Sequence, residues 1–349
     1  MIRKKAKQNK MADTSKYKIL IVDDEQDNLQ LLYRTLRRDY DVTRAQGPLE
    51  ALEILKDNNF NCILSDHKMP DMDGVEFLKR SADLYPDTIR LLVTAYSDVE
   101  ILMNAINYAK IYRYIKKPYS PEELLHIVQL ALEYYQLRED NKKLISDLKD
   151  LFSGTINAIM DALDSKDSYT LGRSRRVAFY TTKIISVMNL PKTEKATIEL
   201  AALLHDIGMI GVQEDILHKI ETLSDNERED IRKHVFYSVK ILEDIKQLDK
   251  VTDIIKYHHE FYNGNGYPFG VKGEEIPLGA RIIAVADAYD SLVSFRPYRE
   301  GLTPEDAIKK IEEERGKQFD PYILDIFESI ADEANREWDK LNPYLNSGK

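Results

Sequence analysis

Residues 17–118 alternate between short apolar runs and amphipathic segments, and this alternation restricts the possible folds more than any other feature of the chain. The apolar runs are predicted strands at 17–25, 40–45, 61–66, 89–96 and 112–118, and the segments between them are predicted helices at 28–38, 49–57, 76–85 and 101–109. Alternation of this kind produces parallel βαβ units, with binding sites at the carboxyl ends of the strands. We therefore predict a doubly wound α/β domain with a five-stranded parallel sheet.

Polar residues stand where these strands end. Asp23 and Asp24 end the first strand, Asp66 the third, Thr94 the fourth and Lys117 the fifth. Carboxylates brought together at neighbouring strand ends repel one another unless a cation joins them, and hard oxygen ligands suit Mg²⁺. The lysine and the threonine hydroxyl could then hold the oxygens of a phosphoryl group. This edge of the sheet is a predicted Mg²⁺ and phosphate site.

Composition limits the other classes of function. The chain has 349 residues, enough for two domains, and its net charge of −10 disfavours DNA or RNA as a partner. It has no apolar run near the ~20 residues of a membrane span, and its one cysteine, Cys62, cannot form an intrachain disulfide. We expect a cytoplasmic protein with no membrane contact. Residues 1–15 are a predicted disordered tail.

A helical segment follows the α/β domain. Pro121 suits the first turn of a helix and Ser120 its N-cap. Within 126–152, the connecting helix, two sets of residues recur every seven positions: Ile127, Tyr134, Asn141 and Leu148, and, three residues after each, Leu130, Leu137, Leu144 and Leu151. An a/d pattern with one Asn at an a position is typical of a parallel two-stranded coiled coil, which would make a homodimer. The alternative is a single amphipathic helix packed on its own domain.

Strand signals fade after residue 151, and the spacing of apolar residues becomes helical, which predicts an all-α domain at 153–349. This domain contains a set of imidazoles and carboxylates suited to Fe, Mn or another divalent first-row metal: His205, Asp206, His234, His258, His259 and Asp287. A carboxylate such as Asp206 can bridge two ions, and a pair of ions can activate hydroxide and stabilise the leaving oxygen of a phosphodiester.

Residues 66–74 read DHKMPDMDG and closely resemble the receiver-domain signature of two-component response regulators. The resemblance covers residues 16–125. It implies that Asp66 is the phosphoacceptor, that Asp23 and Asp24 support Mg²⁺, and that a sensor histidine kinase is a partner. It also matches Tyr114 to the aromatic residue that moves on activation, and Lys117-Pro118 to a Lys-Pro pair whose peptide bond is usually cis.

Three further segments resemble the HD-GYP family over residues 153–335: AALLHDIGMIG at 201–211, YHHEFYNGNGYP at 257–268, and the stretch that begins IPLGARIIAVADAYD at 276. Members of that family hydrolyse cyclic dinucleotides, chiefly cyclic di-GMP, at a metal cluster. The resemblance places the six residues named above at metal-ligand positions and Tyr267, Arg296 and Arg299 at positions that contact the dinucleotide. GGDEF-domain proteins are possible partners on the same ground.

Four positions depart from the family pattern. Arg173 stands at the first metal-ligand position, Met209 replaces a lysine that contacts phosphate, Asn263 replaces an aspartate, and Asp164 stands where many members have Glu. Arginine stays protonated and cannot coordinate a metal. We therefore expect at most one well-held ion, or a distorted pair.

Two functions remain open from the sequence. The first is a phosphorylation-controlled cyclic di-GMP phosphodiesterase of reduced activity. The second is an inactive HD-GYP domain that senses a cyclic dinucleotide or binds a protein. A DNA-binding regulator has little support, because no helix-turn-helix pattern follows the receiver and the chain is acidic.

Overall fold

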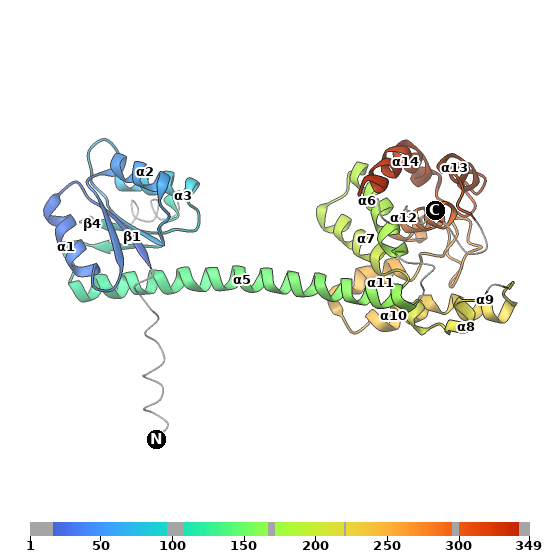
Figure 1. The fold of residues 1–349 in the computed structure, drawn as a ribbon. Coiled ribbons are helices and arrows are strands. Elements are labelled where there is room, and N and C mark those ends of the chain that lie inside the picture. The colour runs from blue at the N-terminus through green and yellow to red at the C-terminus, as the bar shows by residue number, and fades with distance from the viewer. Residues whose placement is uncertain (1–16, 96–107, 167–171, 220, 295–299, 342–349) are drawn as a thin grey trace, which may run out of the picture. The chain divides into compact units, whose positions relative to one another are not determined.

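The chain divides into two compact units, Met1–Asp150 and Leu151–Lys349. The computed structural model describes residues 17–95, 108–166, 172–219, 221–294 and 300–341 (Figure 1). Part of the predicted helix at 101–109 and all of the predicted tail lie outside these ranges. Among the described helices, none combines the length and the apolar character that crossing a membrane requires.

The first unit is built on a parallel sheet in the order β2-β1-β3-β4-β5. Its strands are β1 (Lys18–Val22), β2 (Asp41–Ala45), β3 (Cys62–Asp66), β4 (Ile89–Thr94) and β5 (Arg113–Lys116). The helices described between them are α1 (Gln26–Leu36), α2 (Pro48–Asp57) and α3 (Gly74–Leu84). The prediction of a doubly wound five-stranded parallel sheet is confirmed.

Alternate residues of β1 enter two different cores, as the period of two in a strand requires. Ile19 and Ile21 pack with apolar residues of α1 and of the later helix α5 (Pro121–Lys166), whereas Leu20 and Val22 pack with residues of α2 and α3. Both faces of the sheet are thus covered, which explains why β1, β3 and β4 read as nearly continuous apolar runs.

The connecting helix α5 spans Pro121–Lys166, so it extends beyond both ends of the predicted 126–152 segment. The Ser120 hydroxyl accepts the Glu123 N–H at 3.1 Å and caps the helix, as predicted. The leucines in the middle of α5 are exposed: the exposed fractions of Leu137, Leu144, Leu148 and Leu151 are 67, 57, 56 and 67%. Packing on the chain's own domain therefore does not account for these heptad residues.

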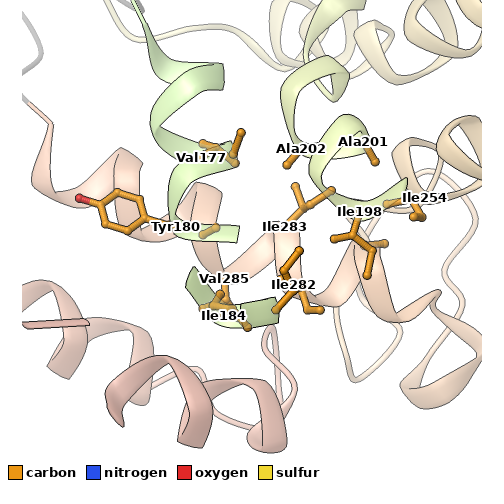
Figure 2. Packing of buried hydrophobic residues seen from close by; sticks show 14 of the residues in the cluster. Val177, Tyr180, Ile184, Ile198, Ala201, Ala202, Ile254, Ile282, Ile283 and Val285 are labelled. Atoms are coloured by element: carbon orange, nitrogen blue, oxygen red, sulfur yellow. The ribbon is translucent and has the colours of Figure 1, made fainter. Parts of the chain in front are cut away.

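The second unit is helical, and among its described residues the β structure is limited to an isolated bridge between Arg315 and Phe319. Its longer helices pack around one core that includes Ile184, Ile198, Ile283 and Tyr180 (Figure 2). The elements after α5 are α6 (Arg173–Val187), α7 (Lys192–Leu204), η3 (Ile207–Gly211), α8 (Glu214–Leu217), α9 (Asp225–Arg232), α10 (His234–Leu242), η4 (Lys246–Leu248), α11 (Asp249–Ile255), η5 (Gly273–Glu275), α12 (Leu278–Val293), α13 (Pro304–Glu312) and α14 (Pro321–Leu341). The predicted all-α domain is confirmed.

Candidate functional site

The carboxyl ends of β1, β3 and β5 bring the predicted receiver residues together. Asp66 ends β3, and its Oδ1 lies 2.5 Å from the Lys117 Nζ, which is also 3.6 Å from Oδ2 of Asp23. Asp24 follows Asp23 and is half-buried. The Lys117-Pro118 peptide bond is cis, as the receiver resemblance implies. These positions form one acidic site with a single lysine against it.

Burial sets the electrostatics of this site. It raises the pKa of the Asp23 carboxyl, although hydrogen bonds from the Glu25 N–H and the Asn28 side chain oppose the rise. For Lys117, burial works to lower the pKa, but the hydrogen bond and charge of Asp66 raise it overall. An acidic site that burial makes costly to ionise is stabilised by a bound cation.

Two other receiver residues lie at neighbouring strand ends. Thr94 is buried at the end of β4, and its hydroxyl contacts Nδ1 of His67 at 3.2 Å. Tyr114 lies on β5 with 40% of its surface exposed. The polar residues at the strand ends do not by themselves point to His67; its position directly after Asp66 is the sequence signal for it.

In the second unit, one group of possible metal ligands comprises Asp206, His234, His258 and His259. Their nearest ligand atoms all lie within 4.8 Å of one another. Asp206 directly precedes η3, His234 begins α10, and the two adjacent histidines follow α11. Three segments far apart in the sequence therefore supply one cluster of the kind that an HD domain uses to bind metal.

Three of the histidine rings have a fixed orientation. Nδ1 of His205, His234 and His258 lies 2.6–2.7 Å from the backbone carbonyl three residues earlier. A carbonyl oxygen only accepts, so each Nδ1 carries the hydrogen. The Nε2 atoms of the same three rings are buried and make no hydrogen bond. At His234 and His258, buried imidazole nitrogens held this way beside the Asp206 carboxylate are the usual arrangement of metal-binding histidines, so the residues of this group fit a metal ion.

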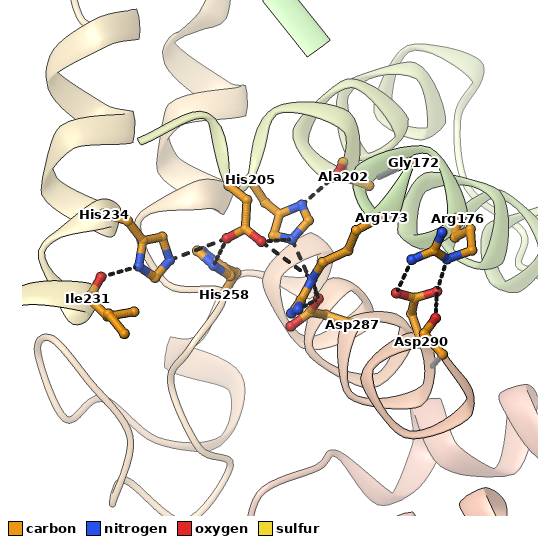
Figure 3. A network of polar contacts seen from close by, with 12 residues as sticks. Gly172, Arg173, Arg176, Ala202, His205, Ile231, His234, His258, Asp287 and Asp290 are labelled. Atoms are coloured by element: carbon orange, nitrogen blue, oxygen red, sulfur yellow. Dashed lines mark hydrogen bonds and ion pairs between the residues drawn. The ribbon is translucent and has the colours of Figure 1, made fainter. Parts of the chain in front are cut away.

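A second group comprises His205, Asp206 and Asp287 (Figure 3). Asp206 belongs to both groups: Oδ1 lies 3.4 Å from Nε2 of His234, and Oδ2 lies 3.2 Å from Nε2 of His205. Arg173, the first residue of α6, enters this second group. Its Nε and Nη2 donate to Oδ1 of Asp287 at 3.1 and 2.7 Å, and Nε lies 3.6 Å from Oδ2 of Asp206. A guanidinium therefore lies among the possible ligands of this second group.

The two groups differ in protonation. Burial works to lower the pKa of His205, but the carboxylates of Asp206 and Asp287 raise it to about 10. Burial and the neighbouring rings of His205 and His234 lower the pKa of His258 to about 3, and burial also lowers that of His259. Within the first group, His258 and His259 thus offer neutral imidazoles as ligands, whereas the second group holds a protonated His205 and a guanidinium between its carboxylates.

The Gly-Tyr-Pro turn borders the first group. The Tyr267 ring stacks on His259 with a centroid distance of 4.8 Å, and the Arg232 guanidinium lies 4.9 Å from the same ring. The buried Glu260 stabilises the turn, because its carboxylate accepts hydrogen bonds from the N–H groups of Phe269 and Gly270. Sequence reasoning predicted Tyr267 but missed Arg232 and Glu260.

A cavity of about 350 Å³ opens beside both groups. Its lining includes Arg173, His258 and Asp287 together with Lys310, Glu313 and Glu314. Arg296 and Arg299, predicted to contact the dinucleotide, lie outside the described residues.

Among the described residues, the other departing positions belong to neither ligand group. Asp164 is on α5, and its carboxylate accepts the Gly172 N–H at 3.0 Å. Met209 packs partly buried against the core. The Asn263 side chain accepts the Asn265 N–H at 3.0 Å, a turn contact that an aspartate oxygen could also make.

The fold and the two sites define a response regulator: a receiver domain joined by a helix to an HD-type output domain. The response regulator receiver domain matches residues 19–129 and the HD domain matches residues 157–323. The chain is 30% identical over 325 residues to the cyclic di-GMP phosphodiesterase response regulator RpfG of Xanthomonas campestris pv. campestris, covering 88% of this chain and 86% of that protein. It is 28% identical over 347 residues to a cyclic di-GMP phosphodiesterase of Thermotoga maritima, covering 92% and 94%.

The chain therefore belongs to the family of HD-GYP cyclic di-GMP phosphodiesterase response regulators. The receiver implies a phosphodonor such as a histidine kinase.

Proposed function

We propose that a sensor histidine kinase phosphorylates Asp66, and that this controls an HD-GYP domain that binds one divalent ion and hydrolyses cyclic di-GMP slowly. One observation carries the proposal: the Arg173 guanidinium donates two hydrogen bonds to Asp287 inside the second ligand group. Arginine keeps its proton and offers no electron pair, so it occupies an ion position without acting as a ligand. Its charge also repels an ion at that position.

The first ligand group supports the single ion. Neutral imidazoles and a carboxylate suit Fe or Mn, which when bound would activate water and stabilise negative charge on a phosphodiester. Asp206, His234, His258 and His259 would hold the ion. Tyr267, stacked on His259, would contact the dinucleotide at the rim. Arg296 and Arg299 belong to the same proposal.

For the receiver, we propose that Asp23, Asp24 and Asp66 support Mg²⁺. Lys117, already 2.5 Å from the Asp66 carboxylate, is placed to bind a phosphoryl oxygen. The Thr94 hydroxyl would bind another. Tyr114 would change position in response.

A second candidate is a domain that binds cyclic di-GMP or a related dinucleotide without hydrolysing it. Two observations favour this candidate over full activity: the Arg173 contact, and Met209, whose side chain packs against the core at the position where the HD-GYP resemblance implies a phosphate-binding lysine.

We also propose that α5 pairs with α5 of a second copy. Leu137, Leu144, Leu148 and Leu151 are all at least 56% exposed and share the a/d positions of the heptad. An exposed stripe of this kind is stabilised by pairing with an identical stripe. Interaction with a GGDEF-domain protein stays a prediction.

The test measures metal and turnover together. Metal content is determined after loading with Mn²⁺ or Fe²⁺, cyclic di-GMP hydrolysis is followed by chromatography, and binding is measured by calorimetry. About one ion per chain with slow hydrolysis supports the first proposal. Binding without hydrolysis supports the second candidate. Two ions with rapid hydrolysis contradict both. If the protein neither binds nor hydrolyses cyclic di-GMP, that result contradicts cyclic di-GMP as the ligand.

A further inference from the structure

His67 lies directly after the phosphoacceptor and against the residue expected to bind the phosphoryl group. Its Nδ1 is 3.2 Å from the Thr94 hydroxyl, and Thr94 is buried. The backbone of His67 is held on both sides: its N–H donates to the Val93 carbonyl at 2.9 Å, and its carbonyl accepts the Gly74 N–H at 2.8 Å. These bonds fix the main chain from which the ring reaches Thr94.

The chemistry of this contact bears on phosphorylation. A buried hydroxyl donates its hydrogen to an acceptor, and Nδ1 of an imidazole that carries its hydrogen on Nε2 is an acceptor. A hydroxyl has only one hydrogen. Thr94 cannot donate that hydrogen to His67 and to a phosphoryl oxygen on Asp66 at the same time.

We propose that His67 is a positioning residue that holds the Thr94 hydroxyl in the unphosphorylated receiver and thereby slows phosphorylation of Asp66. The inference rests on the proposed phosphorylation of Asp66. In the opposite case, a ring that donates to Thr94 would orient the hydroxyl for the phosphoryl group, and its removal would slow the reaction. The two cases therefore differ in the sign of the effect.

The test uses the full chain with Mg²⁺ and acetyl phosphate, which transfers its phosphoryl group to the aspartate carboxylate and releases acetate. His67→Ala is expected to raise the rate of labelling about two- to tenfold, the factor that corresponds to one net hydrogen bond. His67→Asn places an amide oxygen close to the position of Nδ1 and is expected to restore the slower rate. His126→Ala, which truncates an exposed histidine of α5, is the matched control and leaves the rate unchanged.

The same His67→Ala substitution made in a Thr94→Val variant distinguishes the loss of this contact from a general effect on the fold. In Thr94→Val protein, His67→Ala is expected to change the labelling rate by less than twofold, because the hydroxyl is already absent. An unchanged or lower rate for His67→Ala alone, or an equal increase in the Thr94→Val background, would overturn the inference. Failure of the natural protein to be labelled, or labelling of Asp66→Asn, would instead contradict the proposed function.

Discussion

Arg173→His is expected to replace a fixed cation with a metal ligand, and its first effect is on stability. The guanidinium makes two hydrogen bonds to Asp287, and both side chains are largely buried, at 18 and 11% exposure. Removing one partner of a buried pair leaves an uncompensated charge and costs about 3–5 kcal/mol. Without metal, the free energy of unfolding should fall by about that amount.

Adding metal should reverse much of the loss. An imidazole at position 173, beside His205, Asp206 and Asp287, would complete a second set of ligands. An ion that binds only the folded protein stabilises it by about 2.7 kcal/mol at a hundredfold excess over its Kd. The measurements are urea unfolding of chelator-treated protein with and without Mn²⁺, and the metal content per chain, which should rise from one ion toward two.

Arg176→His is the matched control. Arg176 Nε lies 2.5 Å from the buried Asp290, one turn along the same two helices, but Asp290 belongs to neither ligand group among the described residues. This variant should lose comparable stability and gain no additional response to Mn²⁺. If Arg173→His binds no further ion and responds to Mn²⁺ no more than the control does, the guanidinium is not what limits metal binding.

Three other predictions concern separate parts of the molecule. Gly266→Ala should lower the free energy of unfolding by about 1–3 kcal/mol in urea titrations and weaken Mn²⁺ binding, because the added Cβ would lie 2.2 Å from the Phe261 nitrogen. Gly154→Ala, in open space on α5, should raise the free energy of unfolding by about 0.5–1 kcal/mol. Equal effects of the two substitutions would contradict the steric argument. Leu144→Lys should shift sedimentation equilibrium toward monomer, while Ser146→Lys, outside the a/d positions, should not; a monomeric natural protein would refute the pairing. Chelation of divalent ions should abolish labelling by acetyl phosphate, and labelling that persists in EDTA would rule out the role proposed for Mg²⁺.

The receiver fold was predictable because its information is local. Each buried strand is an apolar run of five or six residues bounded by turns, and the alternation with helices leaves few topologies for a parallel sheet. The same argument located Asp23, Asp66 and Lys117 at one edge before any distance was known.

The length of α5 was not predictable from its heptad. Beyond residue 152 the helix continues through Ile156, Met160 and Leu163, which are buried in the core of the second unit rather than in the heptad seam. A change of packing partner inside one helix leaves no break in helical period, so the sequence offered no boundary at Lys166.

The roles of individual polar residues also depended on tertiary contacts. The motif predicted that Arg173 lies at a ligand position, but only the fold shows that it donates to Asp287 and lies within 3.6 Å of Asp206. The contact between His67 and Thr94 crosses from β3 to β4, and one-dimensional spacing carries no sign of it. Asp164 likewise caps the start of α6 through Gly172, a structural role that its place in the motif did not suggest.

The substitution at Arg173 is electrostatically conservative, which explains how the fold can retain the rest of the site. Asp206 and Asp287 are buried together, and burial works to raise the pKa of both carboxyls. The His205 ring and then the guanidinium lower the pKa of Asp206, and the guanidinium and then His205 lower that of Asp287. Positive charge from the chain thus offsets these carboxylates, as a metal ion would. What is lost is the open coordination position, because a guanidinium neutralises charge but cannot bind and activate a water molecule as a metal does. Stability and chemistry are therefore separable at this site, and the ligands around His258 can persist in a domain for which we propose slow hydrolysis.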